Sequence, residues 1–301
     1  MTLPTPHLDK ILAAINNPKM TGTAQTNLLE AKNKYDQWII NMNNEEGDKE
    51  ELVSKLVSLF QDYKFNLDFN IIFSCSNDVL YRQKGQLKLD NSVIEEFLPY
   101  LVNKIFPDLE DVVLGPTKCY SSTYFKTTLS TTPTGGGLTI KSKDQDFAIA
   151  KKLYIKSSHN SDFSRNSLVE TYLGYVTAEC KTNLDKTMFQ EASATAHDVK
   201  SALPGAKYFL LCEWLDMAPA STAATDIDEV LILRKAKRLS ANIRSSFSSY
   251  AGRQQKSAEY KAFLEDNPFD EHIFLRFVNY VESIIHNSDP TETTALTDGF
   301  F

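Results

Sequence analysis

The segment that decides the fold is LGYVTAECKTNLDKTMFQ, residues 173–190. Its first half, Leu173–Lys181, is apolar and reads as a strand, and its second half opens a helix predicted over Thr187–Leu203. Outward from this segment, three more short apolar runs predict strands at Asp146–Ile155, Ala206–Leu215 and Glu229–Leu233. The order strand, strand, helix, strand, strand predicts a mixed α/β core with a right-handed crossover between the second and third strands.

The predicted strand at residues 173–181 ends on an acid, a cysteine and a lysine. Side chains two residues apart on a strand share a face, so Glu179 and Lys181 lie together while Cys180 faces the core. Four other acid-x-lysine triplets occur in the chain, but three lie on predicted helices and one in a polar segment. Without further context, Glu179 and Lys181 form a surface salt bridge worth ~0–1 kcal/mol.

A second carboxylate, Asp146, begins the preceding predicted strand. If these two strands pair as neighbours, Asp146 and Glu179 converge on one hard cation, which takes oxygen ligands and keeps several waters. Lys181 then stands beside a water that the cation polarises, and it either orients or deprotonates that water. Together these residue types favour metal-assisted chemistry on a phosphate.

The run Asp146-Phe147-Ala148-Ile149, followed by Glu179-Cys180-Lys181 and the next helix, resembles the PD-(D/E)XK nuclease core of type II restriction endonucleases. The stretch from Glu179 to Gln190 is similar to that in restriction enzymes that cut short, interrupted, asymmetric sites with two related subunits. The resemblance covers residues 115–233. It implies a restriction-endonuclease-like mixed β-sheet flanked by helices, in a magnesium-dependent enzyme that cleaves double-stranded DNA at a specific short sequence.

The resemblance also implies roles for individual residues. Asp146 and Glu179 are the expected magnesium ligands, joined by the backbone carbonyl of Cys180, and Lys181 is the expected catalytic lysine. Cutting two DNA strands requires two active sites, so we expect a dimer, either of identical chains or with a related partner. A repair or recombination nuclease with the same core, and a DNA-binding protein that does not cut, are the alternative functions.

Two departures from the family pattern concern the first acid. The proline that usually precedes it is replaced by Gln145, so Asp144 and Asp162 are rivals of Asp146 for this role. The spacing between Asp146 and Glu179 is also long for the motif, which a polar insert at Ser157–Ser167 explains.

The charges are unevenly distributed, which bears on DNA binding. Residues 115–261 hold 20 Lys and Arg against 14 Asp and Glu, whereas the net charge of the whole chain is −7. Phosphate neutralisation needs only a local basic surface, so the negative net charge does not exclude DNA as a partner. The candidate DNA contacts are Lys126, Lys141 and Lys143 beside a Ser/Thr-rich loop, Lys186 and Gln190 on the helix after the motif, Arg238 and Arg244 after the last strand, and Arg82 and Lys84 in a second segment. For each of them the alternative is a solvated surface position.

The remaining chain divides into three regions. Residues 1–114 form a mainly helical N-terminal region, residues 115–261 the catalytic core with basic helices, and residues 262–301 a last helix, over Phe269–Ile285, and a polar tail. In the first region, helices are predicted over Glu50–Phe60 and over Ser92–Phe106, the latter capped by Asn91. Short extended pieces are predicted at residues 69–74 and 78–89, and a mobile loop over Ser121–Ser142.

Composition limits the class of protein. With 301 residues, 42% of them apolar and 24% charged, the chain is an ordinary globular protein. Four isolated cysteines predict reduced thiols, and five scattered histidines argue against a zinc hydrolase. The sequence has neither a signal peptide pattern nor a long apolar run, so we expect a cytoplasmic protein, bacterial if the resemblance holds.

Overall fold

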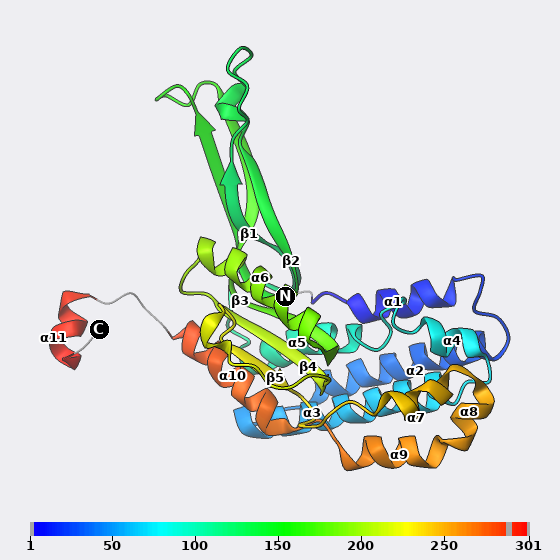
Figure 1. The fold of residues 1–301 in the computed structure, drawn as a ribbon. Coiled ribbons are helices and arrows are strands. Elements are labelled where there is room, and N and C mark those ends of the chain that lie inside the picture. Colours follow the sequence, from blue (N-terminus) through cyan, green and yellow to red (C-terminus); the bar gives the residue numbers. More distant parts are fainter. Residues whose placement is uncertain (1–2, 287–290, 300–301) are drawn as a thin grey trace.

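The structure, a computed structural model, describes residues 3–286 and 291–299 (Figure 1). Its strands are β1 (Val113–Tyr124), β2 (Thr139–Ser158), β3 (Asn166–Leu184), β4 (Lys207–Leu215) and β5 (Glu229–Ile232). Its helices are α1 (Pro6–Ile15), α2 (Thr23–Asn44), α3 (Lys49–Phe65), the π-helical η1 (Asn66–Phe73), α4 (Asp78–Gln83), α5 (Ser92–Ile105), α6 (Lys186–Ala202), α7 (Ala241–Ser245), α8 (Tyr250–Gln255), α9 (Ser257–Asp266), α10 (Glu271–Ile285) and α11 (Glu292–Asp298), with short turns η2 (Thr134–Gly137), η3 (Thr222–Ala224) and η4 (Ser246–Ser248).

The five strands form one mixed sheet in the order β1-β2-β3-β4-β5. β1, β2 and β3 pair antiparallel in that order, whereas β4 lies parallel to β3 and β5 parallel to β4. A parallel pair needs a crossover connection, and α6 supplies it between β3 and β4. The predicted mixed α/β core and the helical N-terminal region are therefore confirmed.

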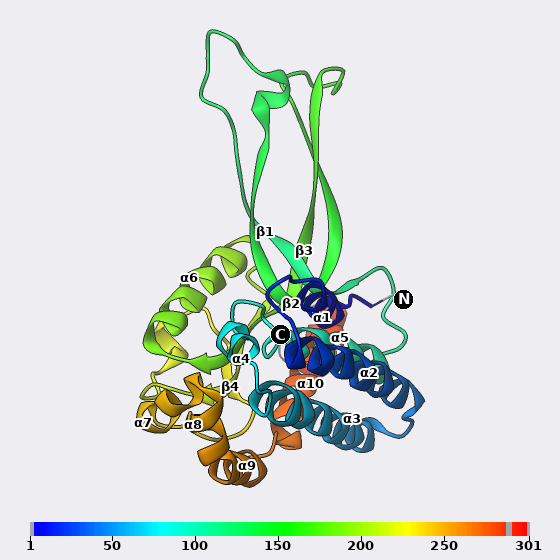
Figure 2. The ribbon, with the colours of Figure 1, turned by 90° about the vertical axis from the view of Figure 1, so that its right-hand side faces the viewer.

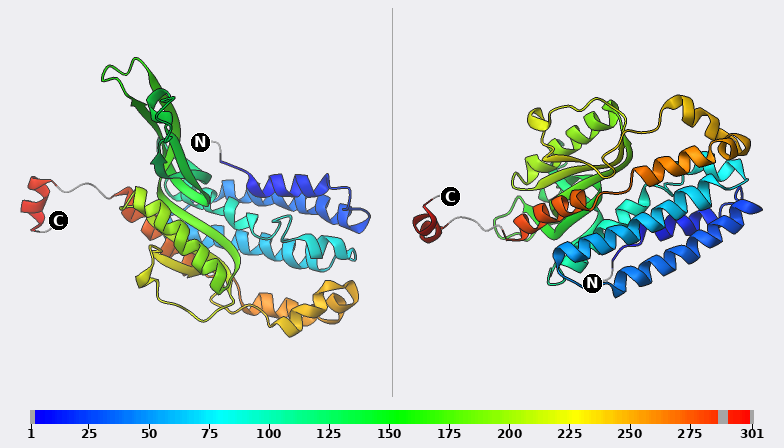
Figure 3. Two further views of the ribbon diagram at one scale, coloured as in Figure 1. Left: turned by 45° about the horizontal axis from the view of Figure 1, so that its top comes forward. Right: turned by 90° about the horizontal axis from the view of Figure 1, so that it is seen from below.

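Helices cover both faces of the sheet. On one face, α6 packs onto Tyr208 and Leu210 of β4. On the other face, the ring of Phe277 in α10 meets Phe147 and Phe209 edge-on, with ring centroids 5.8 and 5.4 Å apart. α10 in turn lies beside α3, so the N-terminal helices extend this second layer (Figure 3). Because β4 is covered on both faces, it is apolar along nearly its whole length.

The chain passes from β3 into α6 with almost no loop. β3 ends at Leu184, and the Asp185 carboxylate accepts a hydrogen bond from the Met188 backbone N–H at 2.9 Å. This side-chain cap satisfies one of the free N–H groups at the start of the helix. α6 is therefore fixed directly after the acid-cysteine-lysine triplet, and it ends just before Pro204, as predicted.

β1, β2 and β3 leave the body together as a long arm (Figures 1 and 2). β2 and β3 span 20 and 19 residues, against roughly five or six in an average strand. The first part of β2 pairs with β1 and its last part with β3, which makes two hairpins. The hairpins lie side by side, because Cys119 pairs with Tyr172 and the Ser157 hydroxyl donates to the Gly135 carbonyl at 2.8 Å. We define the arm as residues 117–145 and 151–173.

Much of this arm lies where loops are predicted, and those predictions are wrong in part. Residues 121–124 of the predicted loop belong to β1 and residues 139–142 to β2, and the predicted polar insert is the end of β2, a turn and the start of β3. Thr and Tyr favour strands. The buried positions of these strands, however, include polar residues such as Ser121, Gln145 and Thr171, so they lack the apolar alternation by which strands are recognised.

The predictions for the N-terminal region were mixed. The helices expected over Glu50–Phe60 and Ser92–Phe106 are confirmed as α3 and α5, but Asn91 provides no side-chain cap for α5. The extended pieces expected at residues 69–74 and 78–89 are wrong, because the first lies almost entirely in η1 and the second contains α4. Short apolar runs do not distinguish a strand from a buried helical segment by period alone.

One hydrophobic core runs through all three regions expected from composition. It joins, for example, Ile11 of α1, Phe97 of α5, Val176 of β3 and Phe274 of α10. The core crosses residues 114 and 261, so the division of the chain into domains at these residues stays a prediction. All four cysteines are buried and unpaired, as expected for reduced thiols. None of the described helices is both long and apolar enough to cross a bilayer.

Candidate active site

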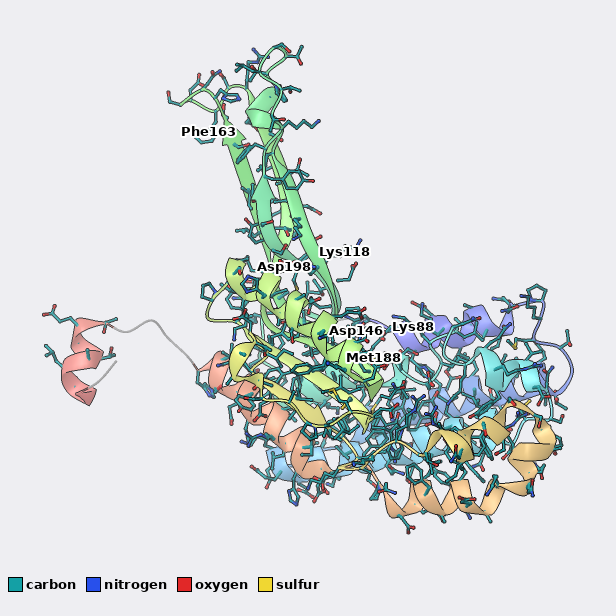
Figure 4. All side chains as sticks on the ribbon, viewed as in Figure 1. Lys88, Lys118, Asp146, Phe163, Met188 and Asp198 are labelled. Carbon is teal, nitrogen blue, oxygen red and sulfur yellow. The ribbon has the colours of Figure 1, made fainter. Side chains whose placement is uncertain are left out.

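The end of the β2–β3 pairing brings the two predicted acids together. In their antiparallel register the last paired residues are Phe147 and Ala178. Asp146 and Glu179 are the next residues along the two strands. The Asp146 carboxylate continues the pairing itself, because its Oδ2 accepts a hydrogen bond from the Cys180 backbone N–H at 2.9 Å. Asp146 is thereby held beside the triplet, at the point where the arm leaves the body (Figure 4).

Glu179 and Lys181 share one face of β3, as the alternation predicts. Lys181 Nζ lies 3.2 Å from Glu179 Oε2. Tyr208 of β4 donates its hydroxyl proton to Glu179 Oε1 at 3.0 Å, so both carboxylate oxygens have partners. The side chains of Glu179 and Lys181 are 13% and 29% exposed, so the pair is partly shielded from water and differs from a salt bridge on an open surface.

Burial and neighbouring charges set the protonation of this cluster. Burial raises the pKa of Asp146, and the opposing effects of the Cys180 N–H and of Lys181 do not cancel it. Burial lowers the pKa of Lys181, but the Glu179 and Asp146 carboxylates outweigh it, so the net pKa is raised. Lys181 is therefore an ammonium in the resting site. Cys180 is buried and its thiol pKa is raised by that burial, so its sulfur stays protonated.

Two further residues of the site, Glu95 and Lys88, escaped prediction. Glu95 lies on α5 and is buried, and its pKa is raised by burial and by the negative charge of Asp146. Its Oε1 accepts a hydrogen bond from the Asn91 amide at 2.8 Å, and Lys88 Nζ lies 3.9 Å from the same oxygen. The sequence does contain a signal for Glu95, because this residue is an acid on the apolar face of a predicted helix, next to Ile94. Such a residue is costly to bury unless it has a partner.

The two rivals for the role of first acid lie elsewhere. Asp144 is on β2 with its side chain 82% exposed, and its Oδ1 lies 3.8 Å from Lys118 Nζ on the arm. Asp162 lies in the turn between β2 and β3, where its Oδ1 accepts a hydrogen bond from the Ser164 backbone N–H at 3.0 Å. The neighbouring Phe163 marks this turn at the far end of the arm (Figure 4). Of the three acids, only Asp146 contacts the triplet.

A basic cleft opens in front of the triplet. Its volume is about 690 Å³, and Asp146, Cys180 and Lys181 form part of its wall. Segments distant in sequence supply the other cations of the wall: Arg82, Lys84 and Lys88 from the region of α4, and Arg238 and Arg244 from the region before and within α7. The predicted contacts Arg82, Lys84, Arg238 and Arg244 are thus brought to the same cleft as Asp146 and Lys181.

The other predicted DNA contacts do not line this cleft. Lys186 and Gln190 are exposed on α6, whose Met188 contributes to the wall instead. Lys141 and Lys143 lie on β2, and both form ion pairs with Asp198 of α6. Lys126 lies on the arm, where its backbone N–H donates to the Gly136 carbonyl at 3.0 Å.

The chemistry of the acids fits a hard cation held mainly by water. Among the residues that the structure describes, no three His, Cys, Asp or Glu side chains are close enough to hold an ion. Mg²⁺ is commonly held by one or two carboxylates and keeps several waters. Asp146 and Glu179 provide two such carboxylates. Burial raises the pKa of Asp146, and a cation bound nearby would lower it again by stabilising the ionised carboxylate.

Comparisons with known proteins gave one family match and one match among solved structures. No curated protein matches the sequence. Among solved structures, the chain is similar to one titled "native BbvCI A2B2 tetramer at low resolution", with 18% identity, a TM-score of 0.37, and 85% of this chain and 97% of that chain covered. The family model described as Bpu10I restriction endonuclease matches residues 86–301, which confirms the expected resemblance to restriction endonucleases. The chain belongs to the Bpu10I restriction endonuclease family.

Proposed function

We propose that this type II restriction endonuclease subunit cuts DNA at the site formed by Asp146, Glu179 and Lys181, with Mg²⁺ as its metal. One observation carries the proposal. The Asp146 carboxylate accepts a hydrogen bond from the Cys180 N–H, and Lys181, which pairs with Glu179, lies with Asp146 at the wall of a basic cleft. The reaction is hydrolysis of a phosphodiester bond of double-stranded DNA by water, at a specific short sequence.

Asp146 and Glu179, with the backbone carbonyl of Cys180, would hold the magnesium ion. When bound, the ion stabilises negative charge on the phosphate and makes its water more acidic. Tyr208 donates to Glu179 Oε1 and so holds this carboxylate in one orientation. Asp146 is oriented in the same way by the Cys180 N–H.

Lys181 acts as a fixed positive charge. Its pKa is raised, so it enters the reaction as an ammonium and orients water and the phosphate oxygens through N–H donors. The cations of the cleft wall, Arg82, Lys84, Lys88, Arg238 and Arg244, lie where they can bind neighbouring phosphates. This arrangement favours orientation by Lys181 over deprotonation of the water.

One chain supplies one such site, whereas double-strand cleavage of a duplex requires a cut in each of its two strands. We therefore propose that two sites act together, in a dimer of identical chains or with a related subunit. Since the substrate is DNA that enters the cell, the proposed location is the bacterial cytoplasm.

Incubation of the protein with plasmid and Mg²⁺ tests this function. Linear products with discrete ends support two identical sites, and nicks at discrete positions support one half of a two-subunit enzyme. Sequencing the ends gives the recognised sequence. A smear would instead favour a repair or recombination nuclease without strict specificity, and intact plasmid a DNA-binding protein that does not cut.

Removing two cations of the cleft is expected to weaken DNA binding. If Arg238 and Arg244 bind phosphates, R238A/R244A should lower the slope of log affinity against log salt by roughly one unit for each lost contact, on any sequence. If either reads a guanine, the loss is ~1–3 kcal/mol at the cognate site only. Anisotropy titrations on cognate and scrambled duplexes at several salt concentrations measure both.

Arg276 provides the control for this prediction, because it is an exposed arginine on α10 that pairs with Glu229 outside the cleft. R276A should keep the wild-type slope. If R238A/R244A also keeps it, together with unchanged specificity, these arginines are a solvated surface and do not contact DNA.

A further inference from the structure

The arm, residues 117–145 and 151–173, is a basic surface on an acidic chain. It holds eight Lys and Arg against three Asp and Glu, in a protein whose net charge is −7. Its surface also exposes aromatic side chains: Phe125, Tyr154 and Phe163 are 53%, 59% and 43% exposed. Cations alternate with one of these rings along β2, where Lys152 and Lys156 flank Tyr154 on the same exposed face.

Only half of the arm's cations have acidic partners. The ion pairs are Lys118 with Asp144 (3.8 Å), Lys152 with Glu170 (2.9 Å), and Lys141 and Lys143 with Asp198 of α6 (3.1 and 2.8 Å). Lys126, Lys151, Lys156 and Arg165 form no ion pair with any residue that the structure describes. Three of these four, Lys126, Lys156 and Arg165, lie toward the far end of the arm, next to η2 or the β2–β3 turn. The end of the arm therefore carries positive charge that the described part of the chain leaves unneutralised.

The composition of the arm indicates what covers it. The centres of protein–protein interfaces are depleted in Lys and Ser. The arm instead contains seven Lys and eighteen Ser and Thr among its 52 residues. Hydroxyls and ammonium groups are the common donors to DNA phosphates, and protein–DNA interfaces are more polar and more basic than those between proteins. Nucleic acid fits this surface better than a second protein does.

The position of the arm indicates which DNA it meets. It rises from the body where Asp146 lies, and Lys118 points from its base toward the side on which Lys88 and the helices lie (Figure 4). The hairpin from Lys151 paired with Leu173 to Ser158 paired with Asn166 is about 23 Å long at ~3.3 Å per residue. At ~3.4 Å per base pair, this length corresponds to about seven base pairs.

We propose that the arm binds the phosphate backbone of duplex DNA that flanks the cut site, over about seven base pairs, through Lys126, Lys156 and Arg165. This inference rests on the proposed function, because it takes the cut site to lie at Asp146. It adds to the cleft a second DNA surface, which contacts phosphates without reading the sequence and which only a sufficiently long duplex can reach.

The test compares fluorescein-labelled duplexes of 12 and 40 base pairs, the shorter being the centre of the longer, by anisotropy in EDTA at several salt concentrations. On the 40-base-pair duplex, K126A/K156A/R165A should lower the slope of log affinity against log salt by about two to three units, at ~0.9 for each lost contact. On the 12-base-pair duplex, wild type and variant should give the same slope. K126R/K156R/R165K, which keeps the charges, should behave as wild type on both.

Three exposed lysines of the body, Lys19, Lys34 and Lys261, serve as the matched control. K19A/K34A/K261A should retain the wild-type slope on both duplexes. Cleavage by wild type with Mg²⁺ reports the proposed function separately, so its failure is not confused with failure of the arm. The proposal is overturned by an unchanged slope on the long duplex, by an equal loss on both duplexes, or by a lower native mass of the variant without DNA, which would identify the arm as a subunit contact.

Discussion

E179Q is expected to lower the rate of DNA cleavage by roughly a thousandfold, because a cation in the site supplies several kcal/mol of charge stabilisation, of which ~4 kcal/mol corresponds to that factor. Glutamine keeps the size of the side chain and can still accept the hydrogen bond from Tyr208 at the position of Oε1. It removes the negative charge that pairs with Lys181 and that would hold the ion. The measurement is the single-turnover rate on a duplex that carries the cut sequence.

The control for this variant is E51Q. Glu51 forms an ion pair with Lys55 at 2.8 Å on the exposed surface of α3, far in sequence from the triplet, so it tests the loss of an ordinary carboxylate. E51Q should cut at the wild-type rate. If E179Q also cut within about tenfold of wild type, Glu179 would be part of a structural salt bridge and not of the active site.

K181M is expected to lower the cleavage rate by roughly 10²–10⁴-fold, the range that a positioned polar group commonly contributes, while DNA binding in calcium persists. The ammonium acts in the chemical step, so its loss should reduce the rate at saturating protein more than it reduces affinity. K181R should recover part of the rate, because an arginine keeps the positive charge that pairs with Glu179.

Lys55, the partner of Glu51, gives the corresponding control, and K55M should be indistinguishable from wild type. Two results would change the interpretation of Lys181. If K181M cut normally, the lysine would have no role in the reaction. If K181R were as inactive as K181M, the lysine would act as a proton acceptor, which an arginine cannot replace.

The sequence predicted the parts of the site that lie along one short stretch of chain. Glu179, Cys180 and Lys181 take their directions from strand alternation, which depends only on position in β3. Asp146 required one further assumption, that β2 and β3 are neighbours, and consecutive strands usually are. β2 and β3 are joined by a short turn and pair as neighbours, as predicted. This pairing places Asp146 beside Cys180.

The residues that prediction missed depend on packing between distant segments. Glu95 reaches the site because α5 packs beside β1 and β2, and Lys88 lies in the segment just before that helix. No periodicity of the sequence predicts this packing. Gln190 follows the motif closely in sequence but lies on the exposed side of α6 and does not line the cleft, so its role as a DNA contact stays a prediction. β1 was missed because its buried positions include the polar Ser121, so the strand has no apolar alternation to recognise.

The account depends most on the identity of the first acid, and one comparison tests it directly. The single-turnover cleavage rates of D146N, D144N and D162N should be measured on the same duplex with Mg²⁺. Because only Asp146 accepts the Cys180 N–H, whereas Asp144 is exposed and Asp162 lies at the far end of the arm, D146N should lose cleavage and the other two should cut as wild type. Normal cleavage by D146N, with loss in D144N or D162N, would contradict the assignment and place the metal away from the Glu179-Cys180-Lys181 triplet.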